Sequence, residues 1–277
     1  MVERFLEKRL AAMKPRTHSK VINMARGMEG VTNLAGGDPD FDTPNHIIEA
    51  LFRAIKKGET HYPPTHGLPD LRRAIAEYHA KDGVDWEPSE VTVTAGSGVA
   101  LFVSMAGTLE PEDDVVLLEP YFMAYSNIVE YLGAKEIGVP LSENYHLDSE
   151  ALKDRLTPRT KMIVLCNPNN PSGTVYTKEE LETIADLAVD QDLLVLSDEV
   201  YKEFVWDGRR HISIASLPGM RERTILCSSF SKTFAMTGWR LGYTIADQPL
   251  ASMIQKIPVG YRTSTFVQKA GIEALEG

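Results

Sequence analysis

Short apolar runs rich in valine, isoleucine and leucine recur along this chain of 277 residues, with amphipathic helical patterns between them. Continuous apolar strands that alternate with helices are typical of a mainly parallel sheet with helices on both faces. The pattern therefore predicts an α/β fold. The expected strands are 91–93, 115–118, 162–165, 193–196, 224–227 and 241–245. The expected helices are 68–81, 98–108, 125–131, 178–189 and 249–257.

Polar and glycine-rich motifs follow several of these strands. Gly96-Ser97-Gly98 follows the strand at 91–93 and opens a helix, an arrangement that presents backbone amides to a phosphate. The segment NPNNPSG at 167–173 follows the strand at 162–165, and SDEVY follows the strand at 193–196. Ligands of parallel sheets bind beyond the carboxyl ends of the strands. The sequence therefore predicts one site at this edge of the sheet.

Lys232 lies in the segment SSFSKTFAMTGWRLGY, among hydroxyl-bearing and small residues, with Arg240 eight positions later. A lysine amine can form a Schiff base with an aldehyde, and hydroxyls with a guanidinium bind a phosphate monoester. Pyridoxal 5′-phosphate (PLP) carries both groups. A surface lysine in a Ser/Thr-rich loop would explain this segment alone, but the further candidates along the chain favour PLP.

Those candidates each have an ordinary structural alternative. Asp198 ends a buried strand, where a carboxylate needs a cation or several donors; it could bind the pyridine nitrogen of PLP or cap a following helix. Asn170 and Tyr201 could both reach the phenolate oxygen. Every residue of 167–173 also favours turns, so this segment could be an ordinary turn, and a lone tyrosine usually belongs to the core or to the surface. Phe122 could stack on the ring face or belong to the core.

Composition narrows the partners and the compartment. The net charge of −10 and the pI near 5.2 argue against a nucleic-acid partner and against an anionic membrane surface. Cys166 and Cys227 lie in apolar runs and are interpreted as core residues in a reducing compartment. The N-terminus lacks a signal-peptide pattern and no apolar run approaches membrane-spanning length, so a cytoplasmic protein is expected. His61, His66 and His79 lack metal-ligand spacing, and no metal is assigned.

Five segments, in order, carry a family resemblance: NLAGGDPDFDTP, HYPPTHGLPDLR, NPNNPSG, SDEVY and SFSKTFAMTGWRLGY. From about Pro15 onward the chain resembles the class I and II aminotransferases of PLP fold type I, the aspartate-aminotransferase-like superfamily. The resemblance implies a three-layer α/β large domain with a mainly parallel central sheet at 41–277. It also implies an N-terminal arm or small-domain segment at 1–40, and a homodimer.

The resemblance also implies residue roles. Lys232 would hold PLP as a Schiff base and then act as the base and acid of the proton shift. Asp198 would bind the pyridinium nitrogen, and Tyr201 with Asn170 the phenolate oxygen. The remaining implied contacts are the ring face (Phe122), the phosphate (Ser97, Gly98, Ser229, Arg240 and, from the neighbouring subunit, Tyr62) and the substrate (Gly37 and Asn170).

Two departures from the family pattern carry expectations. The chain ends at Gly277 with no arginine after Arg262, whereas family members continue into a C-terminal small domain whose arginine binds the substrate α-carboxylate. We expect that domain to be absent, and the chain to bind PLP but transaminate poorly. One aspartate-specific branch has a lysine where this chain has Gly98. A dicarboxylic substrate is thereby disfavoured, and aromatic, branched or small neutral amino acids stay open.

The predicted function is a ping-pong aminotransferase that moves an amino group between an amino acid and a 2-oxo acid. Enzymes of the same fold with other chemistry are alternatives, namely a carbon–sulfur β-lyase or an aminocyclopropane-carboxylate-synthase-like enzyme. A PLP-binding effector domain of a transcriptional regulator is disfavoured by the N-terminus, which leads almost directly into the family pattern. A truncated PLP-binding form with little activity, acting by dimerisation with full-length subunits, is the last alternative.

Overall fold

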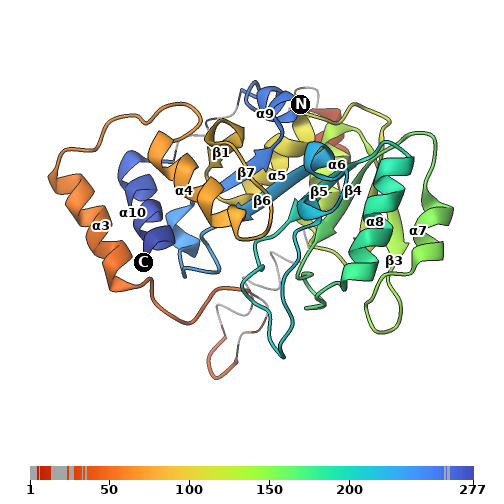
Figure 1. The fold of residues 1–277 in the computed structure, drawn as a ribbon, viewed down its shortest axis with the longest axis horizontal. Helices are drawn as coiled ribbons and strands as arrows, with labels where there is room; N and C mark the ends of the chain where they lie inside the picture. Colours follow the sequence, from red (N-terminus) through yellow and green to blue (C-terminus); the bar gives the residue numbers. More distant parts are fainter. Residues whose placement is uncertain are drawn as a thin grey trace.

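A seven-stranded sheet with the strand order β1-β7-β6-β5-β4-β2-β3 forms the centre of the molecule (Figure 1). The computed structural model describes residues 5, 7–13, 24, 28–32, 34, 36–258, 260 and 263–277. The strands are β1 (Val91–Thr94), β2 (Asp114–Glu119), β3 (Lys135–Pro140), β4 (Thr160–Cys166), β5 (Leu194–Asp198), β6 (Thr224–Ser229) and β7 (Gly242–Ala246).

The sheet is mainly parallel, as predicted. Strands β3, β2, β4, β5 and β6 pair in parallel, whereas β7 is antiparallel to both of its neighbours, β6 and β1. The carboxyl ends of β1, β2, β4, β5 and β6 therefore lie at the same edge as the beginning of β7. This reversal brings Arg240, which precedes β7, to the edge where the other candidate residues follow their strands.

Helices cover both faces of the sheet. They are α1 (Lys8–Ala12), α3 (Asn45–Lys56), α4 (Pro69–Ala80), α5 (Ser97–Ala106), α6 (Ala124–Leu132), α7 (Ser149–Arg155), α8 (Lys178–Asp190), α9 (Gln248–Ile254) and α10 (Thr265–Glu276). Successive strand residues point to opposite faces. Val164 and Leu196 pack with the α5, α6 and α9 side, whereas Ile163 and Val195 pack with the α7 and α8 side. The expected three-layer α/β architecture is confirmed.

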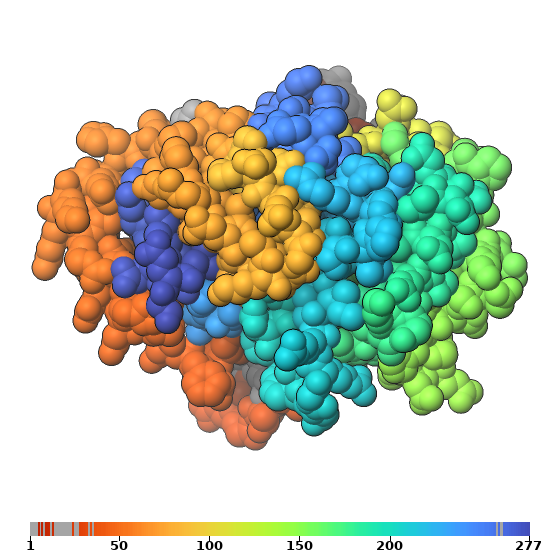
Figure 2. All heavy atoms as spheres, viewed as in Figure 1, coloured from red at the N-terminus to blue at the C-terminus, as the bar shows by residue number. Residues whose placement is uncertain are grey.

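A separate core joins α3, α4 and α10 to β1 and β7. Ile47 of α3, Leu71 of α4 and Ala270 of α10 are all buried in it with Val93 and Tyr243. Figures 1 and 2 show α10 between α3 and α4, so the last helix of the chain closes this end of the sheet.

Each strand and helix expected from the sequence is present, with bounds shifted by a few residues, but β3, α1, α3, α7 and α10 were not predicted. Strand β3 lies at the edge of the sheet and is mostly half-exposed, so it lacks the continuous apolar run that marked the other strands. Helix α7 has only seven residues, too few for a clear helical period.

Part of the N-terminal segment expected at 1–40 lies outside the described residues, and the division at residues 40 and 41 stays a prediction. Helix α1 and the loop at 36–40 are the main described parts of this segment. Within the portion of the chain that the structure describes, no helix is long and apolar enough to cross a membrane.

Candidate functional site

Lys232 lies three residues beyond β6, and its amine meets two other segments at the predicted edge. The amine donates a hydrogen bond to the backbone carbonyl of Gly37. A Cβ atom on Gly37 would lie 3.5 Å from the Lys232 Nζ and 3.9 Å from the Tyr201 hydroxyl oxygen. Burial lowers the pKa of Lys232; the Asp38 carboxylate opposes this effect and Arg240 adds to it. The fold thus places a partly desolvated amine at the centre of the candidate site.

The loop after Gly37 is tied to the turn that carries Lys232. The Thr43 hydroxyl donates to the Ala235 carbonyl at 2.6 Å and accepts from the Trp239 indole at 3.0 Å. The Thr237 hydroxyl donates to the Asp38 carboxylate at 2.6 Å. These bonds join segments almost 200 positions apart, so the position of Gly37 beside Lys232 is held by several contacts.

Asp198, the last residue of β5, is 3% exposed. Its Oδ2 accepts a hydrogen bond from the Tyr125 hydroxyl at 2.7 Å, and its Oδ1 accepts from the Val200 backbone amide at 3.3 Å. Burial raises the pKa of this carboxyl to about 6, and both hydrogen bonds oppose the rise. A turn, rather than a helix, follows β5 directly, so Asp198 is not the cap of a following helix.

The two residues expected at the phenolate oxygen do meet. The Asn170 side-chain amide donates to the Tyr201 hydroxyl at 3.4 Å, and burial raises the pKa of Tyr201 to about 12. Asn167 and Asn169 have structural roles instead: the Asn167 side chain accepts from the Tyr176 backbone amide, and Asn169 donates to the Tyr176 hydroxyl. The segment 167–173 therefore contains both structural asparagines and the candidate site residue Asn170.

The start of α5 forms an open cradle beside Arg240. No side chain caps this helix, because the residue before it is Gly96. A Cβ atom on Gly96 would lie 2.4 Å from Arg240 Nη2, so the guanidinium packs directly on the glycine backbone. A Cβ atom on Gly98 would meet no described atom within 4 Å. Ser229 is buried at the end of β6, where its hydroxyl accepts from the Ser231 amide at 3.4 Å. Amides, hydroxyls and a guanidinium at this place could hold an anion.

Phe122 and Tyr62 lie at the surface. Phe122 follows β2, is 38% exposed and packs its ring edge-to-face on Tyr125, with centroids 5.7 Å apart. Tyr62 lies between α3 and α4 and is 85% exposed.

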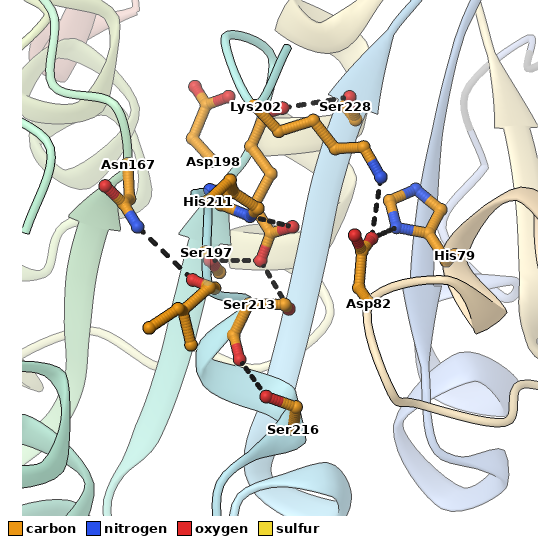
Figure 3. Close-up of polar contacts among 12 residues, drawn as sticks. His79, Asp82, Asn167, Ser197, Asp198, Lys202, His211, Ser213, Ser216 and Ser228 are labelled. Atoms are coloured by element: carbon orange, nitrogen blue, oxygen red, sulfur yellow. Dashed lines mark hydrogen bonds and ion pairs between the residues drawn. The ribbon is translucent and has the colours of Figure 1, made fainter. Parts of the chain in front are cut away.

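A buried polar network not anticipated from the sequence lies behind Asp198 (Figure 3). Glu199 accepts from His211 at 3.0 Å and from Ser213 at 2.7 Å. The Asp82 Oδ2 contacts the His79 ring at 3.0 Å and the Lys202 ammonium at 2.6 Å.

Ligand atoms of His79, Asp82 and Glu199 lie within 4.8 Å of one another, a spacing that a metal ion could use. The Lys202 ammonium already donates to the Asp82 oxygen of that group, so the positive charge at this place is supplied by the chain itself.

The fold and this edge define a class of protein: an α/β protein that gathers a desolvated lysine, a buried carboxylate and an anion cradle at the carboxyl ends of its strands. The family model for aminotransferase class I and II matches residues 29–277. Aromatic-amino-acid aminotransferase 2 of Thermococcus litoralis is 42% identical over 98% of this chain and 71% of its own length. Aspartate aminotransferase of Pyrococcus abyssi is also 42% identical, over 96% of this chain and 70% of its own length.

A solved structure of aspartate aminotransferase from Thermus thermophilus with maleate superposes with a TM-score of 0.92 at 37% identity, covering 98% of this chain and 72% of that one. The chain therefore belongs to the class I and II aminotransferases. It is a PLP-dependent transaminase, whose substrates are an amino acid and a 2-oxo acid.

Proposed function

We propose that Lys232, Asp198 and Tyr201 form the catalytic centre of this transaminase. The observation that carries the proposal is the convergence of the Lys232 amine with Gly37 and Tyr201, next to a strand end that carries a buried carboxylate. The lowered pKa of Lys232 favours the neutral amine, which is the form that attacks an aldehyde.

The residues present fit the chemical groups of PLP. Lys232 suits the aldehyde. The Asp198 carboxylate suits the protonated pyridine nitrogen because it is buried and, among the described residues, no basic side chain is paired with it. Tyr201 and Asn170 suit the phenolate oxygen, and Phe122 the ring face. The phosphate suits the uncapped start of α5 with the neighbouring donors Ser97, Gly98, Ser229 and Arg240.

When bound, PLP supplies an electron sink that stabilises the charge left on a substrate after loss of its α-proton. The Lys232 amine would remove this proton from the substrate α-carbon and return it to the carbon of PLP that had carried the aldehyde. Asp198 would keep the ring nitrogen protonated, and the Tyr201 hydroxyl, which accepts a hydrogen bond from Asn170, would donate to the phenolate oxygen. Gly37 offers a backbone surface without a side chain where the substrate lies against Lys232.

For the substrate we propose an aromatic amino acid, with aspartate as the second candidate. One relative is named for aromatic amino acids, and a groove beside the site is lined by Asn170, Tyr201, Phe204 and Trp206. Aromatic walls stabilise an aromatic side chain by edge and face contacts. Several relatives of similar identity are named aspartate aminotransferases, which supports the second candidate.

We further propose a cytoplasmic homodimer in which Tyr62 reaches the phosphate of the neighbouring subunit. The exposed position of Tyr62 supports this role, since a residue that serves another subunit must lie at the surface. Two free, buried cysteines fit a reducing compartment. We also propose that residues 41–277 form the PLP-binding domain and that 1–40 form an arm.

Borohydride reduction of the chain after incubation with PLP tests the cofactor assignment. We expect the visible absorbance of the bound cofactor to be lost and the label to map to Lys232. Lys232→Ala should take no label, whereas Lys153→Ala, which changes an exposed lysine of α7, should be labelled normally. A label on another lysine would contradict the assignment.

The substrate proposal is tested by adding phenylalanine, tyrosine or aspartate to the PLP-loaded chain without an oxo acid. We expect one equivalent of the aromatic 2-oxo acid per site and a slower release of oxaloacetate. A faster reaction with aspartate would favour the second candidate.

A further inference from the structure

Tyr125 contacts two of the candidate site residues, Asp198 and Phe122, although the sequence indicated it only as part of a helix. It is the second residue of α6 and is 1% exposed. Its hydroxyl is 2.7 Å from the Asp198 carboxylate, and its backbone amide donates to the Phe122 carbonyl at 3.1 Å. Its ring also packs edge-to-face on Phe122, so one buried side chain contacts both the residue proposed for the ring nitrogen of PLP and the residue proposed for the ring face.

The contact with Asp198 has an electrostatic consequence. The charged groups and titratable side chains around Asp198 are Tyr125 of α6, Cys166 of β4, Cys227 of β6, and Glu199 and Tyr201 beyond β5. None of them is a cation. Burial and the charge of Glu199 both raise the pKa of Asp198, while Tyr125 and the Val200 amide lower it. Tyr125 is therefore the one side chain among these that stabilises the ionised carboxylate by donating a hydrogen bond.

The contact with Phe122 is geometric. The two rings lie at 88° to each other with centroids 5.7 Å apart, an edge-to-face pair. Phe122 is partly exposed, and its contact with the buried Tyr125 ring restricts the orientation of the Phe122 ring.

We propose that Tyr125 is a positioning residue of the cofactor site, whose hydroxyl orients the Asp198 carboxylate while its ring supports Phe122. The inference rests on the proposed roles of Asp198 and Phe122. Tyr125 touches neither substrate nor PLP in this arrangement; it acts through the two residues that do.

The variant Tyr125→Phe separates this role from simple core packing, since it removes the hydroxyl and keeps the ring. The matched control is Tyr121→Phe. It removes a nearby tyrosine hydroxyl that donates a hydrogen bond to Glu136 instead of Asp198. PLP affinity is measured by spectroscopic titration between pH 5 and 8.5. In parallel, the stability of the cofactor-free chain is measured by urea denaturation over the same range.

We expect Tyr125→Phe to bind PLP about tenfold more weakly at pH 7.5, since a hydrogen bond to a charged group is lost. The loss should shrink toward pH 5, where protonation removes the charge of Asp198. In the cofactor-free chain, the fall in stability that accompanies ionisation of Asp198 should move to higher pH. Tyr125→Leu should weaken PLP binding further without moving that pH dependence again, because it additionally removes the support of Phe122.

Two results would overturn the inference: a Tyr125→Phe variant that binds PLP like the unchanged chain, or one that loses affinity and stability equally at every pH, as packing alone would cause. If the unchanged chain takes up no PLP, the proposed function itself fails. That outcome is distinguished because it appears before any substitution is made.

Discussion

Asp198 is buried at the end of β5, and the role proposed for it at the ring nitrogen of PLP requires a charge that is unfavourable in the cofactor-free chain. Its carboxyl pKa is raised from 3.8 to about 6 because burial disfavours the charged form. Since the folded-state pKa lies above the unfolded value, the favourable contribution is complete below about pH 4 and is lost as the pH rises through 6. At neutral pH the cofactor-free protein therefore holds an unfavourable buried charge, which a cationic ring nitrogen would compensate.

Asp198→Asn should accordingly stabilise the cofactor-free chain by about 1–3 kcal/mol at pH 7.5, and by much less at pH 4. The amide keeps an acceptor for Tyr125 but carries no charge. Urea denaturation at several pH values measures the difference. The control Asp186→Asn, at an exposed position of α8, should leave the profile unchanged.

The same substitution should weaken PLP binding, because the ring nitrogen loses its anionic partner. A stability difference that is constant from pH 4 to 7.5 would show that ionisation of Asp198 is not its source.

At the scale of secondary-structure elements, the junction of β1 and α5 shapes the anion cradle. Gly96 has a φ of +87°, a conformation that side-chain-bearing residues rarely adopt. A Cβ atom on Gly242 would come 2.5 Å from the Gly96 carbonyl carbon, so the first residue of β7 also packs on this junction. Because β7 is antiparallel to β1, the beginning of β7 lies beside the end of β1. Arg240, two residues before β7, is therefore also placed at this junction.

Gly96→Ala should therefore displace Arg240 and strain the junction. We expect PLP affinity to fall about tenfold or more, since the charge-assisted phosphate contact proposed for Arg240 would be lost. Stability should fall by about 1–3 kcal/mol because of the positive φ.

The matched control is Gly98→Ala, two positions along, where the added methyl group would contact none of the described residues. It retains the backbone amide and should keep most of the affinity. PLP titration measures the affinity, and urea denaturation measures the free energy of unfolding. Equal losses of PLP affinity in the two variants would argue against packing of Arg240 on Gly96.

At the scale of the whole molecule, the proposed homodimer predicts that each site uses two chains. Mixing Lys232→Ala chains with Tyr62→Ala chains should create dimers in which one site combines an intact Lys232 with an intact Tyr62 from the other chain. That site should bind PLP more tightly than the sites of Tyr62→Ala alone, because it regains the phosphate contact.

The mixture is measured by PLP titration after subunit exchange, and light scattering reports the oligomeric state before and after. The control is each variant alone at the same total concentration. An additive result, with no restored high-affinity site in a mixture that has exchanged subunits, would contradict the contribution of Tyr62 to a neighbouring chain.

The fold class, and the edge of the sheet at which the candidate residues were expected, follow from the amino-acid sequence. Local patterns carry this information: apolar runs define buried strands, Asp198 ends one of these strands, and Lys232 lies three residues beyond another. The sequence left open whether Asp198 binds the ring nitrogen of PLP or caps a following helix, because both hypotheses place this residue at the end of the same strand.

The antiparallel direction of β7 and the edge strand β3 are visible only in the folded molecule. The same holds for the contacts of Gly37 with Lys232 and of Tyr125 with Asp198. Gly37 and Lys232 are 195 positions apart. Strand order and side-chain contacts across such distances depend on how whole elements pack against one another. Hydrophobic periodicity describes one element at a time, so it cannot specify which distant side chains meet.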